Sequence, residues 1–316
     1  MNSKAGITII VLIAAFFNKL SAQVIVTTLP DSITYWEKTN RVGADLNQIA
    51  FVNWSVGGNN SVAVLAKGNF TRNYLKNNVS WKNELIMRYG LNSQEGQELR
   101  KTDDQIQLNS IFGYRKDTLS NWYYSARFTF NTQFANGYSY PNTTDEISGP
   151  LSPAYIFLGV GSEYSRKDLG LNVYLSPLTN KTTIVTNNRL ADQGAFGVEA
   201  AVFDEAGNMI RSGRNMRIEV GILLTNQIKR QISKNIMMDH RITLYTDYLN
   251  KFGNVDVDWQ LQLDMTVNEY VKANIGAHLI YDDDIKSTQE VDGQIVTGGP
   301  KIQLKQMLGL GLSYTF

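Results

Sequence analysis

The sequence predicts an all-β protein: an antiparallel transmembrane β-barrel of about twelve strands, preceded by a signal peptide. Three observations predict it. The 316 residues hold only one continuously apolar stretch, at the N-terminus. The rest of the chain alternates apolar and polar residues with period two, over segments too long for ordinary globular strands. The connections between these segments alternate between short and long. A bundle of membrane helices is excluded because the mean hydropathy is only −0.24.

Residues 1–22 are expected to be a signal peptide that exports the chain. Lys4 supplies a positive start, residues 7–17 an uncharged apolar core, and Ala22 a small residue before the cleavage point. A single membrane-spanning anchor is the alternative, but it needs about 20 apolar residues. After cleavage, residues 23–45 are expected to form a short periplasmic segment, and residues 46–316 the barrel.

The clearest strand covers residues 255–267. Val257, Trp259 and Leu261 fall on one parity, and Asp256 and Asp258 on the other. Because successive strand side chains point to opposite faces, this strand has one apolar and one polar face. Its length fits the roughly 9–11 residues of a tilted membrane-spanning strand. The same alternation recurs at residues 85–91, 122–130, 216–224, 271–281 and 308–316.

The apolar faces are expected to meet lipid and the charged faces an enclosed lumen. An Arg or Lys on the lipid face costs about 2–4 kcal/mol at the midplane, whereas inside the barrel it meets water or acidic partners. The alternative is a soluble β-sandwich, in which the apolar faces form the core. The predicted pore-lining residues are Lys82, Glu84, Arg88, Arg127, Arg217, Glu219, Asp256, Asp258, Asp264, Lys272 and His278.

The connections indicate which end of the barrel faces the periplasm. Five alternate connections are short, including residues 76–78 and 268–270. Most of the others are long, including residues 92–104, and the two exceptions are residues 57–60 and 250–253. Short turns on one side and long loops on the other are typical of outer-membrane barrels, whose turns are periplasmic. The expected strands start near residues 46, 62, 79, 105, 121, 154, 169, 215, 235, 254, 271 and 302. Fourteen strands are the alternative, because the β-rich stretch 182–186 could add a hairpin.

Several motifs resemble a Bacteroidota family known only as domain of unknown function 3078. They include Trp54 with Gly57-Gly58-Asn59, Trp81-Lys82-Asn83, Lys101-Thr102-Asp103-Asp104, Leu175-Ser176-Pro177, Gly194-Ala195-Phe196-Gly197 and His278 to Asp284. The resemblance implies an outer-membrane or envelope protein and carries no catalytic residue. The terminal Phe316 resembles the signal that barrel-assembly insertases recognise, so this machinery and outer-membrane lipid are the expected partners.

The composition argues against most kinds of catalytic, metal and nucleic-acid-binding site. With no Cys and two His, thiolate sites and three-His metal centres are excluded. Lys plus Arg total 30 and Asp plus Glu 29, so nucleic-acid binding has no support. His240 shares the parity of apolar neighbours and is expected at the lipid interface. His278 lies near the acidic run 282–284, which favours a solvated acidic rim over a cation site. We therefore expect no enzyme, catalytic residue, metal or cofactor.

Three functions remain. The leading hypothesis is passive or loop-gated passage of a small polar solute through the outer membrane of a Gram-negative cell. The second is a plugged barrel whose loops bind a partner or glycan through aromatic residues such as Tyr138, Tyr140 and Phe203. The third is a lipid-modifying enzyme using His240 or His278. A barrel of about twelve strands lies between the sizes that side chains fill and those that leave a channel, so size does not decide.

Overall fold

Twelve long strands close into an antiparallel barrel in the computed structural model, within the unit Tyr35–Phe316. The structure describes residues 34–49, 59–250, 252–268, 270–291 and 294–316. Within these ranges no helix has the length and apolar character needed to cross a membrane. The barrel strands are β1 (Trp36–Ile49), β2 (Ser61–Lys76), β3 (Val79–Gln94), β4 (Arg100–Tyr114), β5 (Trp122–Thr132), β8 (Ala154–Arg166), β9 (Leu171–Ile184), β12 (Met216–Ser233), β13 (Ile236–Asp247), β14 (Asp256–Thr266), β15 (Val271–Tyr281) and β18 (Gln303–Thr315).

The apolar faces of the strands form the outside of the barrel. Trp122 on β5 and Leu308 on β18 are 61% and 76% exposed, whereas Glu163 on β8 and Lys181 on β9 are buried. A soluble fold would bury the first pair and expose the second, because its apolar faces form the core. The predicted orientation is therefore confirmed, and the soluble sandwich is wrong.

The barrel begins earlier than its sequence pattern predicts. We expected a periplasmic segment over residues 23–45 and a barrel from residue 46, but β1 starts at Trp36. The first half of β1 carries Lys38 and Asn40 on the outward parity, where the other strands carry apolar residues. This end of β1 adjoins the short turns, so it meets water rather than acyl chains, and the alternation is lost there. The predicted signal peptide lies outside the described residues.

Several connections between strands differ in length from those that the sequence predicts. The β2–β3 turn needs only residues 77–78, and β12 extends to Ser233, which shortens the next turn to residues 234–235. At the other end, the predicted short connection at residues 57–60 lies mostly outside the described residues, between Ile49 of β1 and Ser61 of β2. The β3–β4 loop, predicted long, covers only residues 95–99, because β4 begins five residues before its expected start.

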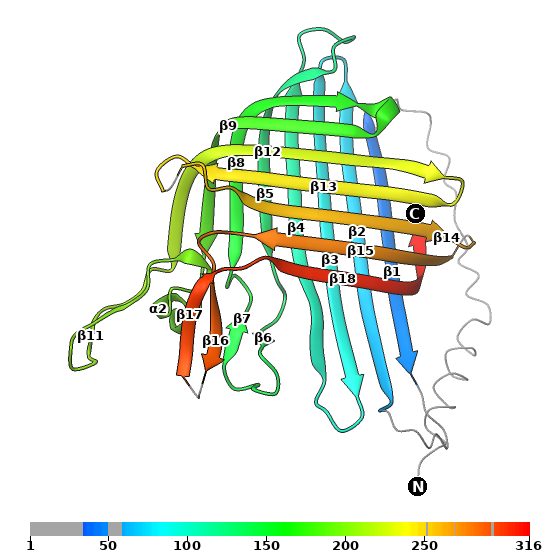
Figure 1. Cartoon of the computed structure of the whole chain (residues 1–316). Coiled ribbons are helices and arrows are strands. Elements are labelled where there is room, and N and C mark those ends of the chain that lie inside the picture. The colour runs from blue at the N-terminus through cyan, green and yellow to red at the C-terminus, as the bar shows by residue number, and fades with distance from the viewer. Residues whose placement is uncertain (1–33, 50–58, 251, 269, 292–293) are drawn as a thin grey trace. The chain divides into compact units, whose positions relative to one another are not determined.

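The long loops build small structures at their end of the barrel. Three hairpins form there: β6 (Gly137–Tyr138) with β7 (Glu146–Ser148), β10 (Val202–Phe203) with β11 (Met209–Arg211), and β16 (Lys286–Val291) with β17 (Gln294–Pro300). Figure 1 shows them below the barrel, beside helix α2 (Asn188–Asp192). The stretch 182–186 mostly extends β9 instead of adding a hairpin, so the count is twelve and not fourteen.

Helix α2 is held by local capping and a small apolar core. The Asn187 side chain accepts a hydrogen bond from the backbone N–H of Leu190, which satisfies one of the free amides at the helix start. Leu190 packs with Val185 and Val198 in a buried cluster. Asn187 also donates to Glu146 on β7, at 2.5 Å. The hydrogen bonds from the backbone and from Asn187 hold the pKa of the Glu146 carboxyl below its usual value. The β9–β12 loop is therefore fastened to the neighbouring loop.

A charge on the outer face should be far more costly than the same charge in the lumen. Ile275 on β15 points outward at mid-strand, and the lumen-facing Gln262 pairs with the next residue, Gly276. We expect Ile275→Arg to lower the free energy of unfolding by about 2–4 kcal/mol. The measurement is urea unfolding in lipid vesicles, with Gln262→Arg as the control, expected to lose less than half as much. Equal losses at the two positions would contradict the assigned faces.

Candidate functional site

All eleven predicted pore-lining residues lie on the lumen-facing parity of their strands. Eight of them line two cavities inside the barrel. Cavity A has a volume of about 460 Å³ and is bordered by Lys82, Glu84, Arg127 and Asp258. Cavity B, of about 170 Å³, is bordered by Arg88, Asp264, Lys272 and His278. The other three, Arg217, Glu219 and Asp256, belong to an ion network at the long-loop end.

Cavity A is framed by polar groups that meet across it. The Lys82 ammonium on β3 lies 2.6 Å from the buried Glu163 carboxylate on β8, three strands further round the wall. Glu163 also accepts a hydrogen bond from Asn172 on β9. Arg127 on β5 donates to the Thr225 hydroxyl on β12 at 2.5 Å. The Lys82–Glu163 and Arg127–Thr225 contacts join strands that are not neighbours, so they brace the barrel internally.

Arg241 borders both cavities and was not predicted as a site residue. Its guanidinium donates to both Glu84 oxygens, at 3.0 and 3.1 Å, although β13 and β3 lie on opposite sides of the barrel. It also donates to Asp239 on its own strand, at 2.9 and 3.0 Å. Arg241 lines both cavities. A bidentate pair of this kind holds the side chain across the lumen.

The charged residues that border cavity B are mostly cations. On one side Arg88 and Lys305 share the Asp103 carboxylate, at 2.7 and 3.1 Å. Near β1, by contrast, Arg41 and Lys272 have side chains that form no hydrogen bond or ion pair with any described residue. Two cations without a partner therefore face the same enclosed space.

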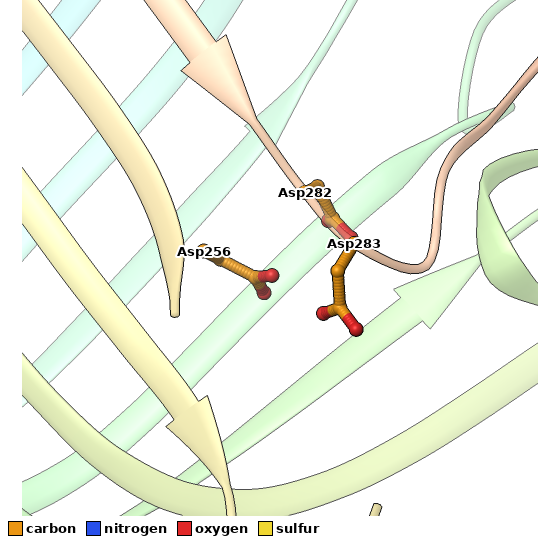
Figure 2. A group of neighbouring side chains, drawn as sticks. All are labelled: Asp256, Asp282 and Asp283. Atoms are coloured by element: carbon orange, nitrogen blue, oxygen red, sulfur yellow. The ribbon is translucent and has the colours of Figure 1, made fainter. Parts of the chain in front are cut away.

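At the long-loop end a single lysine forms ion pairs with three acids. Figure 2 shows Asp256 together with Asp282 and Asp283, whose oxygens lie within 4.8 Å of one another. The Lys181 ammonium lies 2.7 Å from Asp256 and 3.4 Å from Asp282, and 3.7 Å from Glu219. Lys181 is itself buried, so the protein supplies its own cation where a metal would bind. The acidic run is thus neither a free cation site nor merely a solvated rim.

Arg217 connects the lumen wall to the long β9–β12 loop. Its guanidinium donates to the Gly197 carbonyl at 3.1 Å and lies 2.6 Å from the Asp284 carboxylate. Gly197 has φ of +82°, and an added Cβ would meet both partners at about the closest distances that side chains tolerate. Only glycine suits this approach. The loop is consequently attached to the inner wall at the mouth of the barrel.

Neither histidine has catalytic surroundings. His240 faces outward, as predicted, and its Nε2 accepts a hydrogen bond from the Trp259 indole at 2.9 Å. His278 lies in the lumen with Nε2 3.0 Å from Asp258. No serine hydroxyl is hydrogen-bonded to either ring in the described part of the chain. A nucleophile–base pair, which lipid hydrolysis would need, is therefore not formed there.

The model of the family described as "Protein of unknown function (DUF3078)" matches residues 46–138, which confirms the resemblance over that part of the chain. No curated protein matches the sequence.

Solved structures with a similar fold are outer-membrane proteins. A channel from Pseudomonas putida F1, titled COG4313 outer membrane channel, is 11% identical, covers 91% of this chain and 100% of its own, and gives a TM-score of 0.39. The NanC porin is 11% identical over 87% and 98%, with a TM-score of 0.36. The translocator domain of the autotransporter NalP from Neisseria meningitidis is 12% identical over 91% of each chain, with a TM-score of 0.34.

Removing the Lys181 charge should expose the acids around it to a metal ion. We expect Lys181→Met to lower the free energy of unfolding by about 3 kcal/mol, because buried carboxylates lose their counter-charge. Calcium should restore part of that loss in the variant and leave the parent protein unchanged. Urea unfolding in detergent micelles with and without CaCl₂ measures both. The control is Lys229→Met, whose half-exposed pair with Asp239 should matter by less than about 1 kcal/mol; a calcium effect of equal size in all three proteins would refute the account.

Proposed function

We propose that the chain is an outer-membrane channel for small polar solutes, with a preference for anions. The observation that carries this proposal is the pair of polar cavities that follow one another inside the barrel. They share the lining residues Arg41, Asn69, Gln107, Lys229, Arg241 and Gln260. Both cavities have room for water beside the Arg241 side chain. This arrangement supports a path that a small movement of that side chain would open.

The preference for anions follows from the charges that line the cavities. Seven Lys or Arg residues border cavity B, against three Asp residues. Five cations border cavity A, against Glu84 and Asp258. A lumen lined mainly by one sign of charge concentrates ions of the opposite sign. The sequence alone suggested mixed signs, because the cations that tip the balance were not among the predicted residues.

Two contacts are candidates for the gate. The Arg241–Glu84 pair lies across the lumen between the cavities, and the β9–β12 loop is attached at the mouth through Arg217. The first narrows the path with a side chain, and the second with a backbone segment. This combination supports the loop-gated form of the passage hypothesis, with a side-chain constriction added.

The second candidate is a plugged barrel whose loops bind a partner. The β10–β11 hairpin favours it, because Phe203 and Ile210 are 53% and 67% exposed. Tyr138 and Tyr140 do not, because their rings lie against each other and Arg100 lies over the Tyr140 ring. We also infer that the barrel-assembly insertase recognises the outward-facing Phe316 and that outer-membrane lipid covers the wall.

Single-channel recording in planar bilayers tests the leading proposal. We expect discrete conductance steps from the purified protein, and a reversal potential in a KCl gradient displaced toward that of chloride. A protein that inserts fully but carries no current would end the channel proposal and leave the plugged barrel.

Loosening the Arg241 bridge should widen the path. We expect Glu84→Gln to raise single-channel conductance at least about twofold and to strengthen anion preference, because a neutral amide holds the guanidinium less firmly than a carboxylate does. The matched control is Asp264→Asn, which removes the same charge from the lumen without touching a cross-lumen pair. Equal conductance changes in the two variants would show that Arg241 is not the constriction.

A further inference from the structure

The barrel closes through a seam much shorter than its other strand pairs. β1 and β18 pair only from Arg41–Thr315 to Asp45–Gly311, five residue pairs, with further backbone bonds between Asn40 and Phe316. β15 pairs with β18 over ten residues, from Val271–Leu312 to Ile280–Gln303. Beyond Asp45 the remaining residues of β1 pair with β2 alone, and those of β18 before Gly311 with β15 alone. Among the described residues, these parts of β1 and β18 therefore do not pair with each other.

Most outward residues flanking this opening are leucines, although Gln48 on β1 and Gln306 on β18 are polar. Leu308 is the most exposed of the outward residues of β18, at 76%, and Leu310 and Leu46 are also exposed. An unpaired sheet edge in hydrocarbon leaves backbone N–H and C=O groups without partners, which costs several kcal/mol for each group. Such an opening is favourable only if an amphipathic molecule occupies it, with its polar part toward the lumen and its apolar part toward the lipid.

A polar lock holds the seam at the point where the strands part. The Asp45 carboxylate is 2.8 Å from the Lys67 ammonium on β2 and accepts from the Asn274 amide on β15, at 3.1 Å. To reach Asn274 it crosses β18 at Gly309 and Gly311. An added Cβ on Gly309 would lie 3.0 Å from the carboxylate, and one on Gly311 closer still. The two glycines thus leave the space through which β1 is tied to β15.

Cavity B lies directly behind this lock. Its lining includes both seam strands, through Arg41 and Asp45 on β1 and through Gly311 and Ser313 on β18. Arg41 and Lys272, the two lining cations without an ion pair, face it, and the Asp264 carboxylate also lies on its border. At about 170 Å³ the cavity holds an anionic head group or a few waters, but no long chain.

We propose that a single-chain anionic amphiphile, with a carboxylate or phosphate head, binds in this seam. Its head lies in cavity B between Arg41 and Lys272, and its chain leaves through the gap between β1 and β18 into the bilayer. The head supplies the charge that the two cations lack, and the chain covers the apolar edges beside Leu46 and Leu308. This site opens sideways into lipid and does not depend on passage along the lumen.

The cysteine-free chain allows a direct test by clamping the seam. If the pairing continued past Asp45–Gly311, the next pair would be Leu46 and Leu310. We expect the L46C/L310C disulfide to reduce binding of a fluorescent long-chain fatty acid at least about tenfold in micelles, and a reductant to restore it. Restoration in the same sample separates closure of the seam from misfolding. The matched control, L263C/I275C, joins an outward-facing pair of β14 and β15 and should leave binding unchanged.

The chemistry of the ligand is tested separately. We expect Arg41→Gln with Lys272→Gln to weaken binding of the fatty acid and of dodecyl phosphate at least about tenfold. Lys38→Gln, on the outward face of β1, is the control. A neutral monoacylglycerol with the same chain should bind at least about tenfold more weakly than the fatty acid.

Three results would overturn the proposal. They are absence of saturable fatty-acid binding, equal binding of the neutral amphiphile, and binding that the clamp leaves unchanged. Strong competition by inorganic phosphate alone would also overturn it, because it would assign cavity B to a soluble anion of the channel. Conductance of the clamped protein distinguishes the two proposals, since the clamp should leave current along the lumen intact.

Discussion

The fold depends on one constraint: in hydrocarbon a strand cannot leave its backbone groups unpaired or its charges exposed. Closure of the barrel pairs the backbone groups of its edge strands. The period-two alternation places the charged side chains inside, away from the lipid. Glu163, Lys181 and Glu219 are buried although they carry charge, because each finds its counter-charge inside the barrel. The outside is then left to residues such as Trp122 and Leu308. The short β1–β18 seam is where this constraint is least well satisfied, which is why it is the natural place for a ligand.

The ion pairs that close the interior are also what would control a channel. Arg241 bridges to Glu84 from the opposite wall and also borders both cavities. At the mouth of the barrel, Lys181 likewise links strands, because its ammonium forms ion pairs with both Asp256 and Asp282. Stability and permeability are therefore linked in this barrel, because any solute that passes Arg241 must disturb a pair that braces the wall.

Much of the fold could be predicted from sequence because alternation is a local property. The strand at Val271 and the outward position of His240 follow from parity alone. The start of β1 could not, because Lys38 and Asn40 stand on its outward face where the chain leaves the lipid and the apolar signal ends. The loop hairpins were missed for a related reason: β10 and β11 are two and three residues long, too short for any period to appear.

The site was harder to predict than the fold. Parity identifies Arg241 as a lumen residue, since it alternates with His240, but only the closed barrel brings it to Glu84 from 157 positions away. Lys181 is likewise held by Asp256 and Asp282, 75 and 101 positions away along the chain. The balance of charge around the two cavities, on which the proposed preference for anions rests, depends on lining cations such as Arg41, Lys229 and Arg241.

Accessibility of single cysteines along β14 tests the central claim about the two faces most directly, since the chain has no cysteine of its own. In lipid vesicles, a membrane-impermeant thiol reagent should label cysteines placed at Asp258, Gln260 and Gln262 and leave those at Trp259, Leu261 and Leu263 unlabelled. Labelling of both sets, or of the second set alone, would contradict a barrel with lipid outside and a polar interior.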